Sequence, residues 1–299
     1  MESEVIYGPA RLPYMIERWP GYGEKLDEMI NSRLSEIEED RARARGPLLK
    51  SDSMFGKVIS GSVADQRIIF GAAKSTGSFY EIESIQRVGE DLLIQRTTSY
   101  GDEYRDAVVQ LKNIAPLLRA RSSDAVPTEP GICLDGAFIV EPSSPIYEAV
   151  TLGVRLRQFP DVHFSIELIT KDKKVEGDSL EARSAAAEED ARQSGAGAWY
   201  DRVRVIRRGE RKIGNWIGSE YLARKPRINQ VMESHEFAFF SHGEPGNHMV
   251  PSVEIELDTG VKGNKASGMR SSISDEEALY LWDRITSSIR PWAIGKPRK

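Results

Sequence analysis

One short segment near the end of the chain constrains the fold more than any other. Between positions 252 and 258, aliphatic and acidic residues alternate strictly. The aliphatic residues are Val253, Ile255 and Leu257, and the acidic ones are Glu254, Glu256 and Asp258. Because successive side chains of a strand point to opposite faces, this pattern predicts a half-buried strand with one apolar face and one solvated, acidic face. Such strands are typical of antiparallel sheets that are covered on one side only.

Further strand candidates run along the whole chain. Those in the first half are Val5–Tyr7, Arg67–Phe70, Ser78–Ile82 and Asp91–Gln95; those in the second half are Ile132–Val140, Thr151–Arg157, His163–Thr170, Arg202–Arg207, Trp216–Ala223 and Glu236–Ser241. Glycine and charged residues separate many of them, which is typical of hairpins. Strands and helices do not alternate regularly, so a parallel βαβ sheet is not expected.

Several segments have the apolar spacing of amphipathic helices. They run from about Glu24 to Gly46, Glu103 to Ala120 and Ser274 to Pro291; a further helix around Ser179–Arg192 has few large apolar residues and is expected to pack loosely at an edge. Pro116 is expected to kink or restart the second of them. The last begins with Ser274 and Glu277, whose spacing is that of a capping box. Together with the strands, these helices predict the α+β class, with two domains that each pack helices on an antiparallel β-sheet.

A polar segment divides the chain into two parts. Residues 121–130 read RSSDAVPTEP, which is rich in Ser and Pro and has no hydrophobic periodicity. Such a composition is typical of a linker, and a chain of 299 residues is long enough for two domains. We therefore predict an N-terminal α+β domain at 1–122, a linker at 123–130 and a C-terminal α+β domain at 131–299.

The composition argues against two classes of partner. The formal net charge is −5 and no sustained run of Lys and Arg is present, so nucleic-acid binding is not expected. No apolar stretch approaches the roughly 20 residues of a transmembrane segment. The first residues also lack the basic and apolar regions of a signal peptide, so if the protein is exported, this chain is expected to be its mature or trimmed form.

Motifs of the common catalytic sites are missing. The chain has no G-x-S-x-G nucleophile elbow, no G-x-x-x-x-G-K-[ST] phosphate loop and no G-x-G-x-x-G after a strand. Cys133 is the only cysteine, which excludes an internal disulfide and a metal site built from several cysteines. We predict no catalytic residues and no cofactor.

Three histidines lie close together in the sequence: His235, His242 and His248. Their spacings match neither the i, i+4 pair of a helix nor the i, i+2 pair of a strand, which are usual for metal ligands. The residues between them are rich in Gly, Pro and Asn and predict a long loop with solvated histidines. We predict no metal site, but a metal-dependent hydrolase that uses these loop histidines stays an alternative function.

Two pairs of aromatic residues lie among glycine and proline in predicted loops. They are Trp19 with Tyr22, and Trp199 with Tyr200. Each pair either caps the end of a hydrophobic core or contributes anchor residues to a protein interface, in which Trp and Tyr are enriched. We predict these four residues as partner-binding residues.

Five segments of the second half resemble the immunity proteins that neutralise lipase effectors of the bacterial type VI secretion system, the two-domain Tle-type lipase immunity proteins. The segments are Pro130–Ile139, Phe159–Leu168, Gly218–Arg224, Pro251–Gly260 and Ser271–Trp292. They and the intervals between them cover most of residues 130–292. The first half is less similar, because the Gly-Arg-Tyr strand expected before a proline is not recognisable around Tyr7–Pro13.

This resemblance implies a two-domain α+β protein that clamps a cognate lipase or phospholipase effector, an α/β-hydrolase toxin. It also implies a periplasmic location, where the toxin arrives. The expected function is stoichiometric binding that blocks the access of substrate to the active site, without enzymatic activity. A cell-envelope scaffold protein is the other alternative besides a metal-dependent hydrolase.

Overall fold

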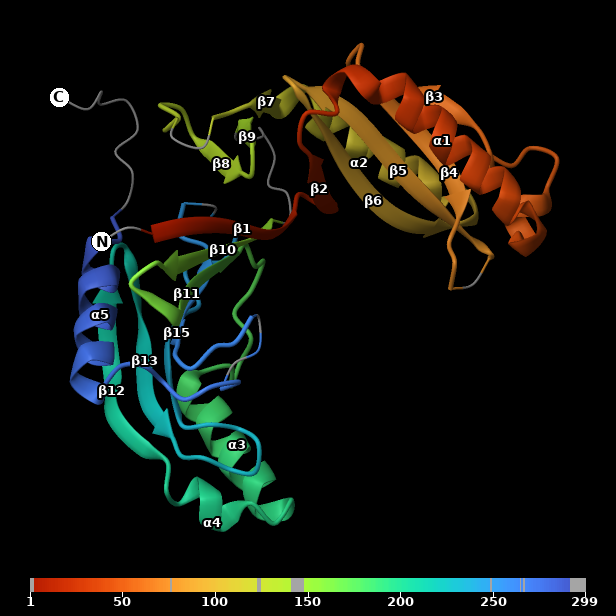
Figure 1. The fold of residues 1–299 in the computed structure, drawn as a ribbon. Coiled ribbons are helices and arrows are strands. Elements are labelled where there is room, and N and C mark those ends of the chain that lie inside the picture. The colour runs from red at the N-terminus through yellow and green to blue at the C-terminus, as the bar shows by residue number, and fades with distance from the viewer. Residues whose placement is uncertain are drawn as a thin grey trace. The chain divides into compact units, whose positions relative to one another are not determined.

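The computed structural model describes residues 3–75, 77–122, 125–140, 148–247, 249–263, 265 and 267–290. Their contacts divide the chain into two compact units, each with its own hydrophobic core (Figure 1). Unit 1 comprises Met1–Gly8 and Ala149–Ala293, and unit 2 consists mainly of Pro9–Glu148. Both units pack helices on an antiparallel sheet, so the chain has the predicted α+β class.

The sheet of unit 2 has the strand order β2, β6, β5, β4, β3, with antiparallel neighbours throughout. Their bounds are Met15–Trp19 (β2), Asp91–Tyr100 (β6), Phe79–Val88 (β5), Gln66–Ala72 (β4) and Val58–Ser60 (β3). Short 3-10 helices span Gly23–Lys25, Asp40–Arg43, Gly46–Leu49, Gly101–Glu103 and Ala115–Leu117.

Two helices cover opposite faces of this sheet. They are α1 (Leu26–Glu39) and α2 (Tyr104–Ile114), seen on either side of β4 and β5 in Figure 1. A Cβ atom at Gly71 would lie 3.3 Å from the side chain of Ile37, so the missing side chain allows α1 to approach β4. On the other face, Gln66 donates a hydrogen bond of 3.0 Å to the carbonyl oxygen of Leu111 in α2.

Several of the predicted elements in unit 2 are wrong in their extent. The helix predicted from about Glu24 to Gly46 ends at Glu39 and is followed by short 3-10 helices. The helix predicted for 103–120 ends at Ile114, because Pro116 has no N–H to continue it, and Leu118–Ala120 forms strand β7 instead. The strand predicted for Ile132–Val140 is a hairpin of β8 (Gly131–Leu134) and β9 (Ala137–Val140). Its turn contains Gly136 with φ of +65°, a conformation that favours glycine.

These short strands form a separate sheet in the order β7, β9, β8. The strands before and after the predicted linker at 123–130, β7 and β8, both pair with β9. The salt bridge of 2.8 Å between Arg18 and Asp135 ties the hairpin turn to β2. The domain boundary at 123–130 stays a prediction from the sequence.

The sheet of unit 1 has the order β12, β13, β14, β15, β11, β10, β1. Their bounds are Arg204–Ile213 (β12), Trp216–Lys225 (β13), Ser234–Ser241 (β14), Ser252–Asp258 (β15), Phe159–Ile169 (β11), Ala149–Leu156 (β10) and Ser3–Arg11 (β1). Helix α5 (Asp275–Ser288) lies on one face and α3 (Leu180–Gln193), followed by the single turn α4 (Gly197–Tyr200), on the other (Figure 1).

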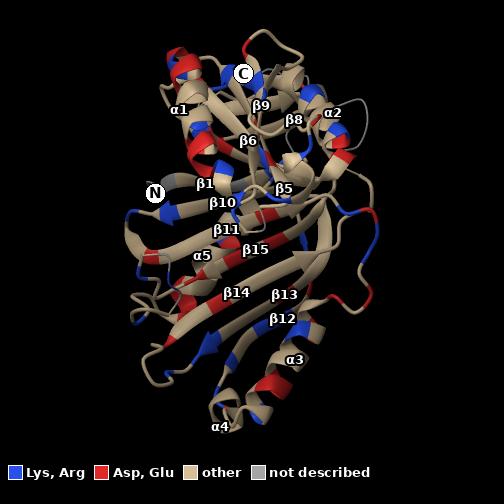
Figure 2. Cartoon of the chain, turned by 90° about the vertical axis from the view of Figure 1, so that its right-hand side faces the viewer, with Lys and Arg blue, Asp and Glu red and all other residues tan. Residues whose placement is uncertain are grey.

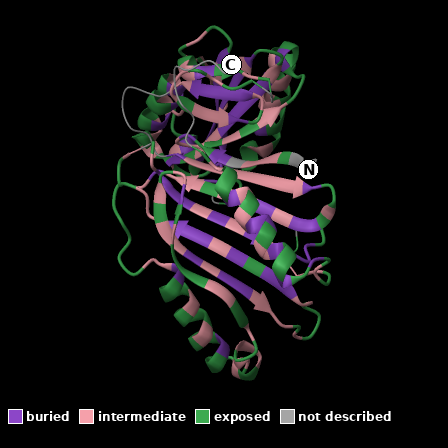
Figure 3. Ribbon diagram, turned by 90° about the vertical axis from the view of Figure 1, so that its left-hand side faces the viewer, coloured by how far each residue is buried: buried purple, intermediate pink, exposed green. Residues whose placement is uncertain are grey.

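The core of unit 1 lies between the sheet and α5. Trp282 of α5 is fully buried, with its ring centroid 6.4 Å from that of Phe164 and 6.1 Å from that of Phe237. Figure 3 shows buried residues along the strands that α5 crosses. Burying one such side chain contributes about 1.5–3 kcal/mol. The capping box predicted from Ser274 and Glu277 is confirmed, so α5 begins where the sequence places it.

The alternating pattern of β15 is confirmed on its apolar side. Val253, Ile255 and Leu257 are buried in the core. The acidic side is half-buried rather than solvated, which the sequence did not predict. The difference arises because neighbouring strands on both sides and α3 shield this face from water.

Candidate partner-binding surface

The predicted aromatic residues of unit 1 are half-buried and bound to their own chain. The indole N–H of Trp199 donates a hydrogen bond of 2.7 Å to the carbonyl oxygen of Pro226. The hydroxyl of Tyr200 donates one of 2.9 Å to the carbonyl oxygen of Ser184 in α3. These bonds join α3, α4 and the segment after β13. The geometry supports a capping role, and partner binding by this pair stays a prediction.

The predicted aromatic residues of unit 2 are more open. Trp19 ends β2, and its ring meets that of Tyr22 edge to face at a centroid distance of 5.5 Å. The Trp19 indole donates a hydrogen bond of 2.9 Å to Glu17, and the Lys25 ammonium lies 4.8 Å from the centre of the Tyr22 ring. Tyr22 is 38% exposed. The two predicted pairs thus belong to different units, and each forms a local aromatic contact.

The prediction of solvated loop histidines is wrong for His235. This residue lies in β14 and is buried, because its main chain pairs with β13 and its ring packs 5.6 Å from Phe237. His242 follows the other end of β14, and its ring meets that of Phe240 edge to face at a centroid distance of 4.9 Å. At about 3.3 Å per strand residue, seven residues separate the two histidines by roughly 23 Å, too far to share an ion. His248 lies outside the described residues.

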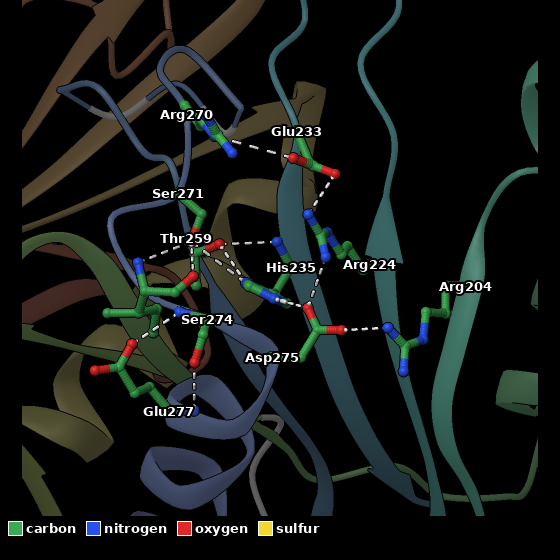
Figure 4. A network of polar contacts seen from close by, with 11 residues as sticks. Arg204, Arg224, Glu233, His235, Thr259, Arg270, Ser271, Ser274, Asp275 and Glu277 are labelled. Atoms are coloured by element: carbon green, nitrogen blue, oxygen red, sulfur yellow. Dashed lines mark hydrogen bonds and ion pairs between the residues drawn. The ribbon is translucent and has the colours of Figure 1, made fainter.

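His235 joins a polar network at the start of α5 (Figure 4). Its Nε2 lies 2.9 Å from Asp275, and its Nδ1 lies 3.0 Å from the hydroxyl of Thr259. Arg224 and Arg204 also contact Asp275, at 3.3 and 3.0 Å. Burial alone would raise the pKa of Asp275, but the hydrogen bond from His235 and the two arginines outweigh it and hold this pKa below its usual value.

The order of Ser271, His235 and Asp275 in this network superficially matches a Ser-His-Asp triad. However, the Ser271 hydroxyl lies 3.4 Å from the ring nitrogen and donates a better bond, of 3.0 Å, to the carbonyl oxygen of Ile273. Thr259 is the closer partner of that nitrogen. The arrangement therefore does not activate Ser271 as a nucleophile, for which the base must accept its proton. The network instead holds the start of α5 against β14.

Carboxylates from three neighbouring strands gather on the sheet face opposite α5, which we call the acidic face. They are Glu167 on β11, Glu254, Glu256 and Asp258 on β15, and Glu236 on β14. In the strand register Glu167 lies opposite Glu254, and Asp258 lies opposite Glu236. Figure 2 shows acidic bands on β11, β15 and β14.

Only part of this negative charge is compensated by the unit itself. Arg183 of α3 forms a salt bridge of 2.7 Å with Glu254, and Lys225 of β13 pairs with Glu236. Glu167, Glu256 and Asp258 have no ion pair among the residues that the structure describes. Like charges directly opposite each other destabilise a sheet. This face therefore carries an unfavourable charge that the fold alone does not explain.

The repulsion between these carboxylates contributes to raised pKa values. Burial, reinforced by the charges of Glu236 and Glu256, raises the pKa of Asp258 to about 7. Burial also raises the pKa of Glu256, and the negative charges of Glu254, Glu236 and Glu167 raise it further. A cationic side chain placed on this face would relieve the repulsion and form charge-assisted hydrogen bonds. The acidic face is thus chemically suited to a basic protein surface.

The sequence indicated only one strand of this site. The alternation in residues 252–258 marked the acidic side of β15, but Glu236 and Glu167 carry no such signal. They join the site through the pairing of β14 and β11 with β15, and that register is not readable from the residues alone.

Residues 125–292 of the chain match the family described as the Tle cognate immunity protein 4 C-terminal domain. A search of curated proteins finds no match. None of the helices in the described part of the chain is long and apolar enough to cross a membrane.

Solved structures with the same fold exist. A chain in the crystal structure of the Tle4–Tli4 complex has a TM-score of 0.76 at 20% identity, with 97% of this chain and 92% of that chain covered. The apo structure of the immunity protein TplEi of the T6SS from Pseudomonas aeruginosa has a TM-score of 0.73 at 21% identity, with 97% and 91% covered. The same protein in complex with an "L" peptide has a TM-score of 0.69 at 21% identity, with 97% and 92% covered.

The family match spans more than half of the chain and contains α5, its capping box and all three strands of the acidic face. This chain therefore belongs to the family of Tle cognate immunity proteins, through the C-terminal domain of Tle immunity protein 4.

Proposed function

We propose that this protein binds a lipase or phospholipase effector of a type VI secretion system stoichiometrically and inhibits it. The observation that carries the proposal is the family match over residues 125–292. The fold shared with TplEi and with a chain of the Tle4–Tli4 complex supports it over 97% of the chain.

Inhibition of this kind is steric and needs no bond-making by the immunity protein. The bound protein covers the route by which lipid reaches the active site of the effector, so activity falls in proportion to the complex formed. The described polar network around His235 agrees with this view, because it holds α5 in place and leaves Ser271 unactivated. On this proposal the protein acts as an inhibitor without an enzymatic role of its own.

The contact surface would combine a charged part and aromatic anchors. The acidic face of unit 1 attracts basic side chains of the effector and speeds the encounter. Trp19 and Tyr22 of unit 2 offer exposed aromatic surface. Trp199 and Tyr200 are less accessible, and their contribution would be indirect, by holding α3 beside the acidic face. The site of action would be the periplasm, where an injected lipase meets its substrate.

A titration of lipase activity tests the proposal. The purified protein is added to the lipase effector encoded beside its gene, and hydrolysis of a phospholipid substrate is followed. Activity should fall linearly and reach zero at one equivalent, and the mixture should elute as a single complex in size-exclusion chromatography. Full activity at a tenfold excess would exclude this effector as the partner, and the same result with every lipase effector of the organism would refute the function.

A further inference from the structure

A hollow of about 340 Å³ lies on the sheet of unit 2 beside α1. Trp19 of β2, Met29 and Ser32 of α1, and Ile85 and Ile94 of β5 and β6 line it together with charged residues. A second hollow, of about 390 Å³, adjoins it and shares Glu81 and Arg96. Both Thr97 and Thr98 of β6 line the second hollow, so it is not confined to one face of the sheet; we call the two hollows together the α1 groove.

The α1 groove exists because α1 covers only part of the sheet. Ile37 of α1 sits over Gly71 of β4, where the absence of a side chain lets the helix approach closely. The contacts of α1 are with β4 and β5, so the part of the same face formed by β6 and β2 stays open. Met15 of β2, at the second hollow, is 41% exposed as a result.

Most charged residues of the groove are already paired with one another; among the described residues no ion pair is found for Arg11 or Lys74. Arg33 binds Glu81 at 2.5 Å and also pairs with Glu83, which is buried. Arg96 lies 3.3 Å from Glu83 and pairs with Glu17 as well. The groove therefore offers a rigid base, and a charged ligand entering it would have to break existing ion pairs, which is costly at a half-buried site.

The unpaired surface of the hollow combines apolar side chains with the hydroxyl of Ser32 and the ammonium of Lys74. The Trp19 ring is fixed by its bond to Glu17 and its contact with Tyr22, and Met29 is an adaptable side chain opposite. Lys74 is the lining cation for which no ion pair is found among the described residues. The volume is at the low end of ligand pockets, about 300–1,000 Å³, which suits one or two side chains.

We propose that the hollow between Trp19 and α1 receives an uncharged apolar side chain, aliphatic or aromatic, from the lipase effector, with an acidic residue of the effector facing Lys74. This inference rests on the proposed function and adds its anchor point in unit 2. Pockets of this kind, with an aromatic wall and water excluded on binding, carry a large share of the binding energy of an interface.

A matched pair of substitutions on α1 tests the inference. Ser32 lines the hollow, whereas Ser35 lies on the same helix outside the lining, and both are exposed. Ser32→Trp fills the hollow and is expected to weaken binding of the effector at least tenfold, measured by titration calorimetry, while Ser35→Trp leaves it within twofold. Equal and undiminished binding by both variants would overturn the inference. Failure of the unmodified protein to bind would instead refute the proposed function.

Two further variants confirm that the effect is local. Trp19→Ala is expected to weaken binding at least tenfold, and Tyr280→Ala, which removes a 60% exposed aromatic residue of unit 1, should not. Lys74→Glu should weaken binding several-fold, and less so at high salt, because rim charges are screened. All variants are first compared by circular dichroism and thermal unfolding. Folded Trp19→Ala protein with undiminished affinity would also overturn the inference.

Discussion

Asp258 on β15 lies directly opposite Glu236 on β14, so two carboxylates face each other across one rung of the unit 1 sheet. Lys225 forms its salt bridge with Glu236, and its charge offsets only part of the effect of burial, Glu236 and Glu256, which raise the pKa of Asp258. A pair of this kind weakens the free protein and strengthens its attraction for a cationic partner. The stability and the binding of the protein should therefore respond in opposite directions when the charge is removed.

Asp258→Asn is expected to stabilise the free protein by about 1 kcal/mol at pH 8, because it removes a like-charge contact. In a unit of this size, that change raises the unfolding midpoint by about 2–4 °C in a thermal melt. Glu210→Gln, on the exposed strand β12, is the control and should have no effect. Destabilisation of the Asp258→Asn protein would show that the carboxylate has a favourable partner.

The stability that the Asp258→Asn substitution adds to the free protein should depend on pH. The pKa of Asp258 is raised from 3.8 to about 7 in the folded protein. The unfolded chain therefore ionises first, and stability is lost as the pH rises from about 4 to 7. The substitution should be most stabilising above pH 7 and nearly neutral near pH 4, in melts recorded from pH 4 to 8. A gain of the same size at every pH would mean that ionisation is not its cause.

Reversal of one negative charge on the acidic face should weaken the complex with the effector. Glu256→Lys is expected to reduce affinity for the effector about 10–100-fold and to slow association, because steering by complementary charge acts mainly on the encounter rate. Biolayer interferometry at low and high salt measures both effects. Glu210→Lys, with the same change of charge elsewhere on the sheet, is the control, and an equal loss in both variants would point to net charge alone.

Binding should also weaken as the pH falls through 7. Asp258 takes up a proton near its raised pKa of about 7 and then no longer attracts a cation. Affinity is expected to fall several-fold between pH 8 and 6, and the Asp258→Asn protein should bind weakly with little dependence on pH over this range. Titration calorimetry at three pH values makes the comparison. An unchanged pH profile in Asp258→Asn would assign the titration to another group.

The network at the start of α5 should contribute to the stability of unit 1. Asp275 accepts contacts from His235, Arg224 and Arg204. Its substitution by Ala removes the carboxylate from His235 Nε2 and both arginines, although Arg224 keeps its salt bridge of 2.7 Å with Glu233, and we expect a loss of about 2–3 kcal/mol in denaturant unfolding at pH 7. The pKa of Asp275 is lowered, so this contribution is present above its ordinary value and disappears as the pH falls through the lowered one. Glu276→Ala, at the next and exposed position, should cost far less.

The sequence predicted the local features of this fold well. The alternation in β15 and the capping box of α5 depend on residues close together in the chain, and both are present. The class of the fold follows from such segments. The resemblance of residues 130–292 to immunity proteins agrees with the family match at 125–292.

The features that the sequence did not predict depend on long-range pairing. His235 is separated from Thr259 and Asp275 by 24 and 40 residues, so its burial could not be inferred from the residues next to it in the sequence. Glu236 joins the acidic face through strand register. The hollow beside Trp19 depends on where α1 rests, which Gly71 decides from a distant strand. Predicting each of these features requires knowledge of how elements far apart in the chain are positioned in the fold.

Strand β9 is bonded on one side to β7, at Leu118–Ala120, and on the other to β8. The family match begins at residue 125, between β7 and its partner. A chimera that exchanged only the matched segment between two immunity proteins would join a foreign β9 to a resident β7. A recombination that transfers the effector specificity of one immunity protein to another should therefore be better tolerated when the crossover falls before Leu118. All three strands of this small sheet then come from the same parent protein.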